Sequence, residues 1–238
     1  MKERQEKMLN RIINQYIREA QPIGSKTLSE NMEPRLSSAT IRNEMVNLID
    51  QGYLEQPHLS AGRIPTLKAW DYYLENLIEF EIEKKTLISW KNDLILSKQK
   101  NFNDKKETIK DLVKKMADCS QSLSFAAFSK NVFYYTGLTN LLIQPEFKEH
   151  PAVYNLSQII DHLDEILEKN FDFLGQKKEI EILIGKKNPF GDFCGAVLSR
   201  FKIGPKQEGL IGILGPIRMD YQRNFTFVKT VRELINKI

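Results

Sequence analysis

The sequence is poor in the residues and motifs from which most catalytic and metal sites are built. It contains three histidines and two cysteines in 238 residues. Cys119 and Cys194 form no CxxC pair and are too few for a disulfide framework, so they are interpreted as buried small hydrophobic residues. No GxSxG, HExxH or Walker-type phosphate-loop motif is present. The acidic cluster around His162 is interpreted as a solvated helix face. The sequence therefore predicts a protein that is not an enzyme and holds no metal or cofactor.

Long apolar runs and a strong charge of one sign are also missing. No stretch approaches the ~18 consecutive apolar residues of a membrane span, and the charged N-terminus lacks the apolar run of a signal peptide. We therefore expect a cytoplasmic protein without a membrane partner. The formal net charge is only +4, and residues 1–78 hold ten Lys/Arg against ten Asp/Glu. Binding to nucleic acid would thus have to rest on local clustering of charge.

The first part of the chain shows helical periodicity interrupted by turn residues. Apolar residues at three- and four-residue spacing predict a helix over residues 3–19. Its stripe consists of Met8, Leu9, Ile12, Ile13, Tyr16 and Ile17. Pro22 and Gly24 break this helix, and Ser25 is the predicted N-cap of a short helix over residues 26–31.

A third helix is predicted to begin after an N-cap at Ser37 or Ser38. It ends at Gly52, a position where a left-handed residue is usually needed. Its predicted buried stripe consists of Ile41, Met45, Leu48 and Ile49. Three short helices with tight turns within about 50 residues are typical of a helix-turn-helix.

A hairpin is predicted directly after the third helix. Residues 53–58 have extended character, residues 59–62 contain turn residues, and residues 63–65 are predicted to form the returning strand. Prolines at the margins suit edge strands, and Thr66 is the predicted N-cap of a fourth helix. A hairpin that follows a recognition helix is the wing of a winged helix. The sequence therefore predicts an N-terminal winged helix-turn-helix.

The exposed side of the third helix carries the strongest candidates for a binding site. Arg42 can bond a guanine edge with two hydrogen bonds and Asn43 an adenine edge, while hydroxyls and free amides of the first turn can hold phosphate. The predicted DNA-binding residues are Lys26, Ser37, Ser38, Thr40, Arg42, Asn43, His58, Ser60 and Arg63. Arg42 and Asn43 could instead be ordinary solvated residues, but the order of helices and hairpin favours DNA.

Beyond residue 78 the pattern changes. Residues 79–120 are predicted to form a helical connector, with a loose heptad of Leu77, Phe80, Leu87 and Leu94 that is either core or a dimer seam. Residues 121–238 mix helical periodicity with short apolar runs, which is typical of an α+β domain. The predicted elements are helices over 106–117, 146–169 and 224–237 and strands over 180–184, 194–201 and 209–214.

Several motifs closely resemble those of the heat-inducible transcription repressor family HrcA. In the first 66 residues they are segments 22–28, 36–45, 52–58 and 60–66, and further along they are 137–142, 144–147 and 212–221 with Arg223. The resemblance implies a bacterial repressor that binds an inverted-repeat operator, the CIRCE element, as a dimer. It also implies a winged-helix domain, a GAF-like domain with a dimerising insertion, and an active form that is supported by the GroEL chaperonin.

The chain departs from the family pattern in length. Family members run about a hundred residues longer, and the missing material is expected between Ser124 and Val132, where residues 122–130 bridge the gap. This puts the dimerising insertion and a ligand cavity in doubt and predicts a reduced GAF-like domain over residues 121–238. Leu59 stands where the family usually has a hydroxyl residue, so one polar contact of the wing is expected to be lost.

The resulting hypothesis is a homodimeric repressor of chaperone and chaperonin genes, relieved on heat stress. Residues 1–78 would bind double-stranded DNA, and the C-terminal part would pair the subunits and respond to temperature or a GroEL-type chaperonin. Two other functions remain open: a winged-helix regulator that senses a small molecule in its C-terminal domain, and a chaperonin-interacting adaptor that has lost operator binding.

Overall fold

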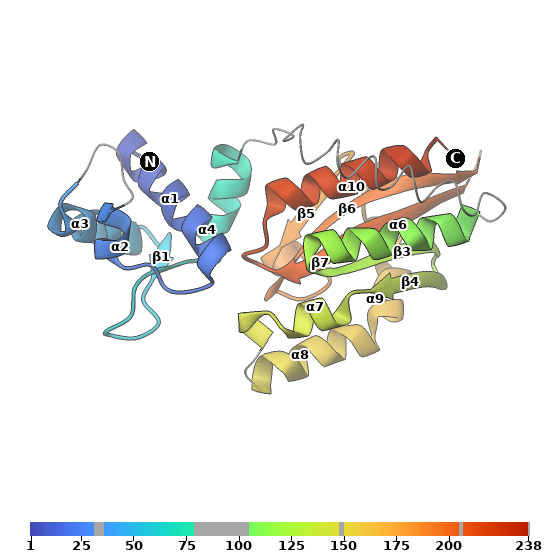
Figure 1. The fold of residues 1–238 in the computed structure, drawn as a ribbon, viewed down its shortest axis with the longest axis horizontal. Coiled ribbons are helices and arrows are strands. Elements are labelled where there is room, and N and C mark those ends of the chain that lie inside the picture. The colour runs from blue at the N-terminus through green and yellow to red at the C-terminus, as the bar shows by residue number, and fades with distance from the viewer. Residues whose placement is uncertain (31–35, 79–104, 148–149, 205–206, 238) are drawn as a thin grey trace. The chain divides into compact units, whose positions relative to one another are not determined.

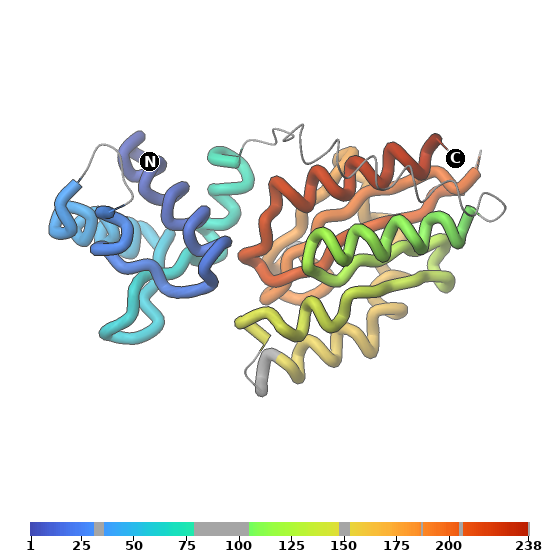
Figure 2. The backbone as a smooth tube through the Cα atoms, viewed as in Figure 1, coloured from blue at the N-terminus to red at the C-terminus, as the bar shows by residue number. Residues whose placement is uncertain are grey.

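The computed structural model describes residues 1–30, 36–78, 105–147, 150–204 and 207–237. The chain divides into two compact units, Met1–Glu79 and Phe80–Ile238, which can be followed in Figures 1 and 2. The predicted heptad of Leu77, Phe80, Leu87 and Leu94 lies outside the described residues except for Leu77.

The first unit contains the helices that its apolar periodicity predicts. Helix α1 spans Glu3–Glu19, as predicted, and α2 spans Ser25–Glu30. Helix α3 spans Ser38–Asp50, and α4 spans Leu67–Tyr72 before a π-helical turn, Tyr73–Leu77. The first four residues of the predicted α1 stripe are fully buried, whereas Tyr16 and Ile17 are half-buried. The prediction of Ser25 as an N-cap is wrong by one residue, because Ser25 is already helical.

Local side chains determine where α3 and α4 begin and end. The Ser37 hydroxyl accepts a hydrogen bond from the Thr40 amide at 3.1 Å, so Ser37 is the N-cap of α3. Gly52 has a φ of +77°, and the Tyr53 amide reaches back to the Leu48 carbonyl at 2.8 Å. The predicted N-cap at Thr66 and the predicted left-handed residue at Gly52 are confirmed.

The hairpin after α3 is shorter than predicted. Strand β1 comprises Leu54–Glu55 and β2 comprises Ile64–Pro65, paired antiparallel. Residues 56–63 form a loop, and Pro57 near its start has no amide hydrogen with which to extend the ladder from β1. Ile23 adds a bridge to Arg63, with two N–H···O bonds of 2.9 Å. The turn between α1 and α2 is therefore bridged to the residue that precedes β2.

The second unit is built on a five-stranded antiparallel sheet with the order β4-β3-β7-β6-β5. The strands are β3 Leu123–Ser129, β4 Val132–Thr136, β5 Glu181–Ile184, β6 Cys194–Gly204 and β7 Gln207–Pro216. The sequence predicts the last three but not β3 and β4. Residues 122–130 are therefore more than a bridge across a gap, because they contain an inner strand that pairs with β4 on one side and β7 on the other.

Helices cover both faces of this sheet. Figure 1 shows α6 (Lys105–Ser120) and α10 (Tyr221–Ile235) side by side over one face. Alternate residues of β3 and β6 pack into the opposite core: Leu123, Phe125, Ala127, Cys194, Ala196 and Leu198. That core is completed by α8 (His150–Asp161) and α9 (Leu163–Asn170), so the helix predicted over 146–169 is interrupted at His162. The fold is mixed α/β, in agreement with the predicted class.

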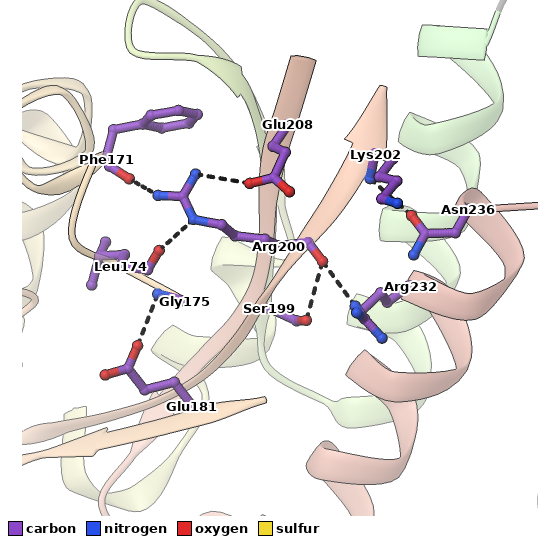
Figure 3. Close-up of polar contacts among 10 residues, drawn as sticks. All are labelled: Phe171, Leu174, Gly175, Glu181, Ser199, Arg200, Lys202, Glu208, Arg232 and Asn236. Atoms are coloured by element: carbon purple, nitrogen blue, oxygen red, sulfur yellow. Dashed lines mark hydrogen bonds and ion pairs between the residues drawn. The ribbon is translucent and has the colours of Figure 1, made fainter. Parts of the chain in front are cut away.

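Arg200 of β6 forms hydrogen bonds with the helical layers on either side of the sheet (Figure 3). Its guanidinium donates to the carbonyls of Phe171 and Leu174 after α9, where it caps the helix end. Its own carbonyl accepts from Arg232 of α10 at 3.0 Å. One strand residue thus bonds to both helical layers.

Candidate nucleic-acid interface

Helix α3 has one buried face and one exposed face. Its buried residues are Ile41, Glu44, Met45 and Leu48. Arg42 and Asn43 are exposed on the opposite side, as predicted from the apolar stripe. Val46 and Asn47, which are not among the predicted binding residues, are exposed there too. Of the predicted buried stripe, Ile41, Met45 and Leu48 are buried, whereas Ile49 is half-buried.

The first turn of α3 uses its hydroxyls largely within the helix. Ser37 caps the helix, and its Oγ lies 2.9 Å from Oγ1 of Thr40. Ser38 is exposed in the first helical position. This leaves the Ser38 hydroxyl and the first-turn amides other than that of Thr40 as the groups best placed to meet an anion.

A buried acidic residue holds α3 against α1. Glu44 is 7% exposed and forms an ion pair with Arg4. The position of Glu44 on the buried stripe between Ile41 and Leu48 could have indicated an ion pair from the sequence, because a carboxylate on a buried face needs a cationic partner. The pair restrains the rotation of the helix that presents Arg42 and Asn43.

The loop between β1 and β2 is held by Gln56, a residue that was not predicted to have a role in the loop. Its Nε2 donates to the carbonyls of Leu59 at 2.7 Å and Ala61 at 3.1 Å. His58 and Ser60 are exposed, and Leu59 at the tip is fully exposed. The predicted DNA-contacting residues His58 and Ser60 are therefore exposed on a loop whose backbone is held by two hydrogen bonds from Gln56.

Arg63 lies differently from the other predicted residues. It is half-buried, and its Nη1 donates to the Ala61 carbonyl at 3.0 Å, so its guanidinium bonds to its own loop. Lys26 is exposed on α2, which packs against α3. All nine predicted residues thus lie in the first unit, on α2, α3 and the hairpin.

An aromatic cluster joins this hairpin to the flanking helices. Tyr53 and Tyr72 meet edge to face with ring centroids 5.5 Å apart, and the Lys68 ammonium lies 4.5 Å from the Tyr53 ring centroid. The hydrogen bond that Tyr72 donates to Glu6 of α1 raises the pKa of Tyr72 to about 12. These contacts link the residue before β1 to α4, and α4 in turn to α1.

In the second unit, two of the motif segments meet. Arg218, between β7 and α10, bonds to both carboxylate oxygens of Glu146 and to Gln144 Oε1 at 2.8 Å. Gln144 in turn donates to the Gln121 carbonyl before β3 at 3.1 Å. Residues far apart in sequence are thus joined by one guanidinium.

The two cysteines and the acidic cluster around His162 differ in how far they are buried. Cys194 is buried, which raises the pKa of its thiol to about 12, whereas Cys119, predicted to be buried, is half-buried. His162 and Glu165 are exposed and 3.3 Å apart. Within the described ranges no three His, Cys, Asp or Glu side chains are grouped for a metal ion, and no helix is long and apolar enough to span a membrane.

The described residues thus define a mixed α/β protein whose N-terminal unit exposes an Arg–Asn pair on one capped helix. Residues 67–224 match the family model described as HrcA protein C terminal domain. The chain belongs to the HrcA family.

Curated relatives are similar along almost their whole length. The protein named heat-inducible transcription repressor HrcA from Natranaerobius thermophilus is 28% identical, with 96% of this chain and 94% of the relative covered. The one from Brevibacillus brevis is 23% identical, with 100% and 98% covered. These alignments run over 327 and 337 positions, more than the 238 residues present here. The relatives are therefore longer, as predicted.

A solved structure has the same fold. The crystal structure of a hypothetical protein superposes with a TM-score of 0.76 at 17% identity and covers 100% of this chain and 98% of its own. At that identity the likeness concerns the fold alone.

Proposed function

We propose that the protein is a heat-inducible transcription repressor that binds an inverted-repeat operator upstream of chaperone and chaperonin genes. Membership of the HrcA family and the names of the relatives support repression. The observation that carries DNA binding is the capped helix α3, with Arg42 and Asn43 exposed opposite its buried face. Such a helix can enter the major groove and meet base edges.

The proposed division of labour has three parts, of which the connector includes α6 (Lys105–Ser120), the helix that packs on the sheet of the second unit. Residues 1–78 act as a winged-helix domain, residues 79–120 connect, and residues 121–238 act as a reduced GAF-like domain that pairs two subunits in the cytoplasm. An inverted repeat has two-fold symmetry, so a homodimer places one α3 in each half-site. Repression follows from occlusion of the promoter and is relieved on heating, with a GroEL-type chaperonin supporting the active form.

Light scattering of the protein with and without the inverted repeat tests this proposal. We expect a dimer in solution and a complex of one dimer with one duplex. If the protein does not retard the inverted repeat but is captured by immobilised GroEL, the adaptor function replaces the proposal. A monomer that binds single half-sites would contradict the dimeric mechanism.

Arg42→Ala should weaken operator binding by about 1–3 kcal/mol and relax specificity at one base pair, because a bidentate contact to guanine is lost. Fluorescence anisotropy with labelled operator and single-base variants measures both effects. Arg18→Ala is the matched control, since it removes an exposed arginine from α1. Arg42→Lys should keep the salt dependence but lose the specificity. Wild-type affinity of Arg42→Ala would show that α3 does not read the operator.

Arg63→Ala should weaken binding to all sequences alike. Its guanidinium supplies positive charge at the hairpin and bonds to the Ala61 carbonyl, so the variant loses both charge and support of the loop. Titrations at several salt concentrations should give a flatter dependence of affinity on salt than the wild type. A change in base preference without a change in this slope would contradict the assignment.

A further inference from the structure

Val46 is an apolar residue on the exposed face of α3. It is 43% exposed, while its neighbour Met45 is 3% exposed and part of the core. It follows Arg42 by four residues and Asn43 by three, which places it beside both on the same face of the helix. A groove that receives Arg42 and Asn43 therefore also receives Val46.

The side chain of Val46 adds a kind of contact that its neighbours lack. Arg42 and Asn43 can recognise polar base edges, whereas thymine also presents a C5-methyl group in the major groove. A valine has no donor or acceptor, so its favourable partner on a base edge is that methyl group. At an exposed position valine is also a poorer helix former than alanine, so local helix stability does not account for it.

We infer that Val46 contacts the methyl group of one thymine in each operator half-site and thereby contributes to specificity. This inference rests on the proposed function and extends it from polar readout by Arg42 and Asn43 to an apolar contact. The surrounding structure favours a fixed position for Val46, because Glu44 is ion-paired to Arg4 and Ser37 caps the helix.

The test is a scan in which each thymine of a symmetric operator is replaced by deoxyuridine, which removes only the methyl group. Affinities are measured for the wild type, Val46→Ala, Val46→Thr and Leu67→Ala. Leu67 is 40% exposed at the first position of α4 and serves as the matched apolar control. For the wild type we expect one symmetric thymine at which the replacement weakens binding about threefold to fivefold per half-site, as for losing one buried methyl group.

Val46→Ala should bind the thymine operator more weakly by a similar factor and should no longer distinguish thymine from deoxyuridine at that position. Val46→Thr, which keeps the shape but replaces one methyl group by a hydroxyl, should discriminate less than the wild type, and Leu67→Ala should discriminate as well as the wild type. The inference is overturned if no replacement affects the wild type, or if Val46→Ala still discriminates. If the wild type does not bind the operator at all, the proposed function fails as well, which is a distinct result.

Discussion

Gly62→Ala should destabilise the first unit by about 3 kcal/mol, in the upper range for an overpacked site, and remove most specific operator binding. A Cβ atom at residue 62 would lie 2.6 Å from the carbonyl carbon and oxygen of Ile23 and from the carbonyl carbon of Pro22. These are backbone atoms, so no side-chain rotation relieves the clash. The chain must separate there, and the paired bonds between Ile23 and Arg63 are lost.

The expected loss of binding follows from the same geometry. The bridge between Ile23 and Arg63 joins the turn before α2 to the hairpin, so its loss uncouples the loop from the helices. Thermal unfolding and anisotropy titrations measure the two effects. Gly24→Ala is the matched control, because its Cβ would meet only Thr27 Oγ1 at 3.8 Å. Wild-type stability of Gly62→Ala would mean that the two segments are not in close contact.

Arg218→Ala should destabilise the second unit by about 2–3 kcal/mol. The Arg218 side chain is 12% exposed and that of Glu146 is 29% exposed. Removing the guanidinium leaves a largely buried carboxylate and the Gln144 amide oxygen without their cationic donor. Breaking a fully buried pair costs about 3–5 kcal/mol, and the partial exposure of Glu146 reduces that value.

Urea unfolding of the full chain measures this loss through the transition of the second unit. Lys130→Ala is the matched control, since it removes an ion pair with Asp172. The side chains of this pair are 49% exposed for Lys130 and 61% exposed for Asp172. A pair so exposed contributes about 0–1 kcal/mol. Equal unfolding free energies for the two variants would contradict the importance of burial at Arg218. Arg218→Lys should fall between them because lysine cannot form the bidentate contact.

The helices of the first unit could be predicted because their signals are local. Caps and helix-ending residues act within a few positions of the helix end, and the stripe from Met8 to Ile13 repeats within one helix. The exposed Arg42 and Asn43 follow from the same periodicity. The motif resemblance to the HrcA family also rests on contiguous residues, and the family match supports it.

Strand β3 could not be predicted in the same way, whereas β4 (Val132–Thr136) carries a local strand signal of β-branched and aromatic residues. Residues of β3 are buried on both faces, so polar and apolar side chains do not alternate and no period of two is visible. Small residues such as Ala126 and Ala127 weaken the hydrophobic signal further. Tertiary packing of helices on both sides, rather than local propensity, makes this segment an inner strand.

By itself, the sequence determined the helices of the first unit, the exposed face of α3 and the family, because each is encoded in neighbouring residues. Only the tertiary structure decided which polar groups meet. It directs Arg63 to the Ala61 carbonyl, buries Glu44 against Arg4, and joins Arg218 to Glu146 across 72 residues. These contacts depend on how distant segments pack. The same holds for Gly62, where glycine is needed only because the backbone of Pro22 and Ile23 lies beside it in space.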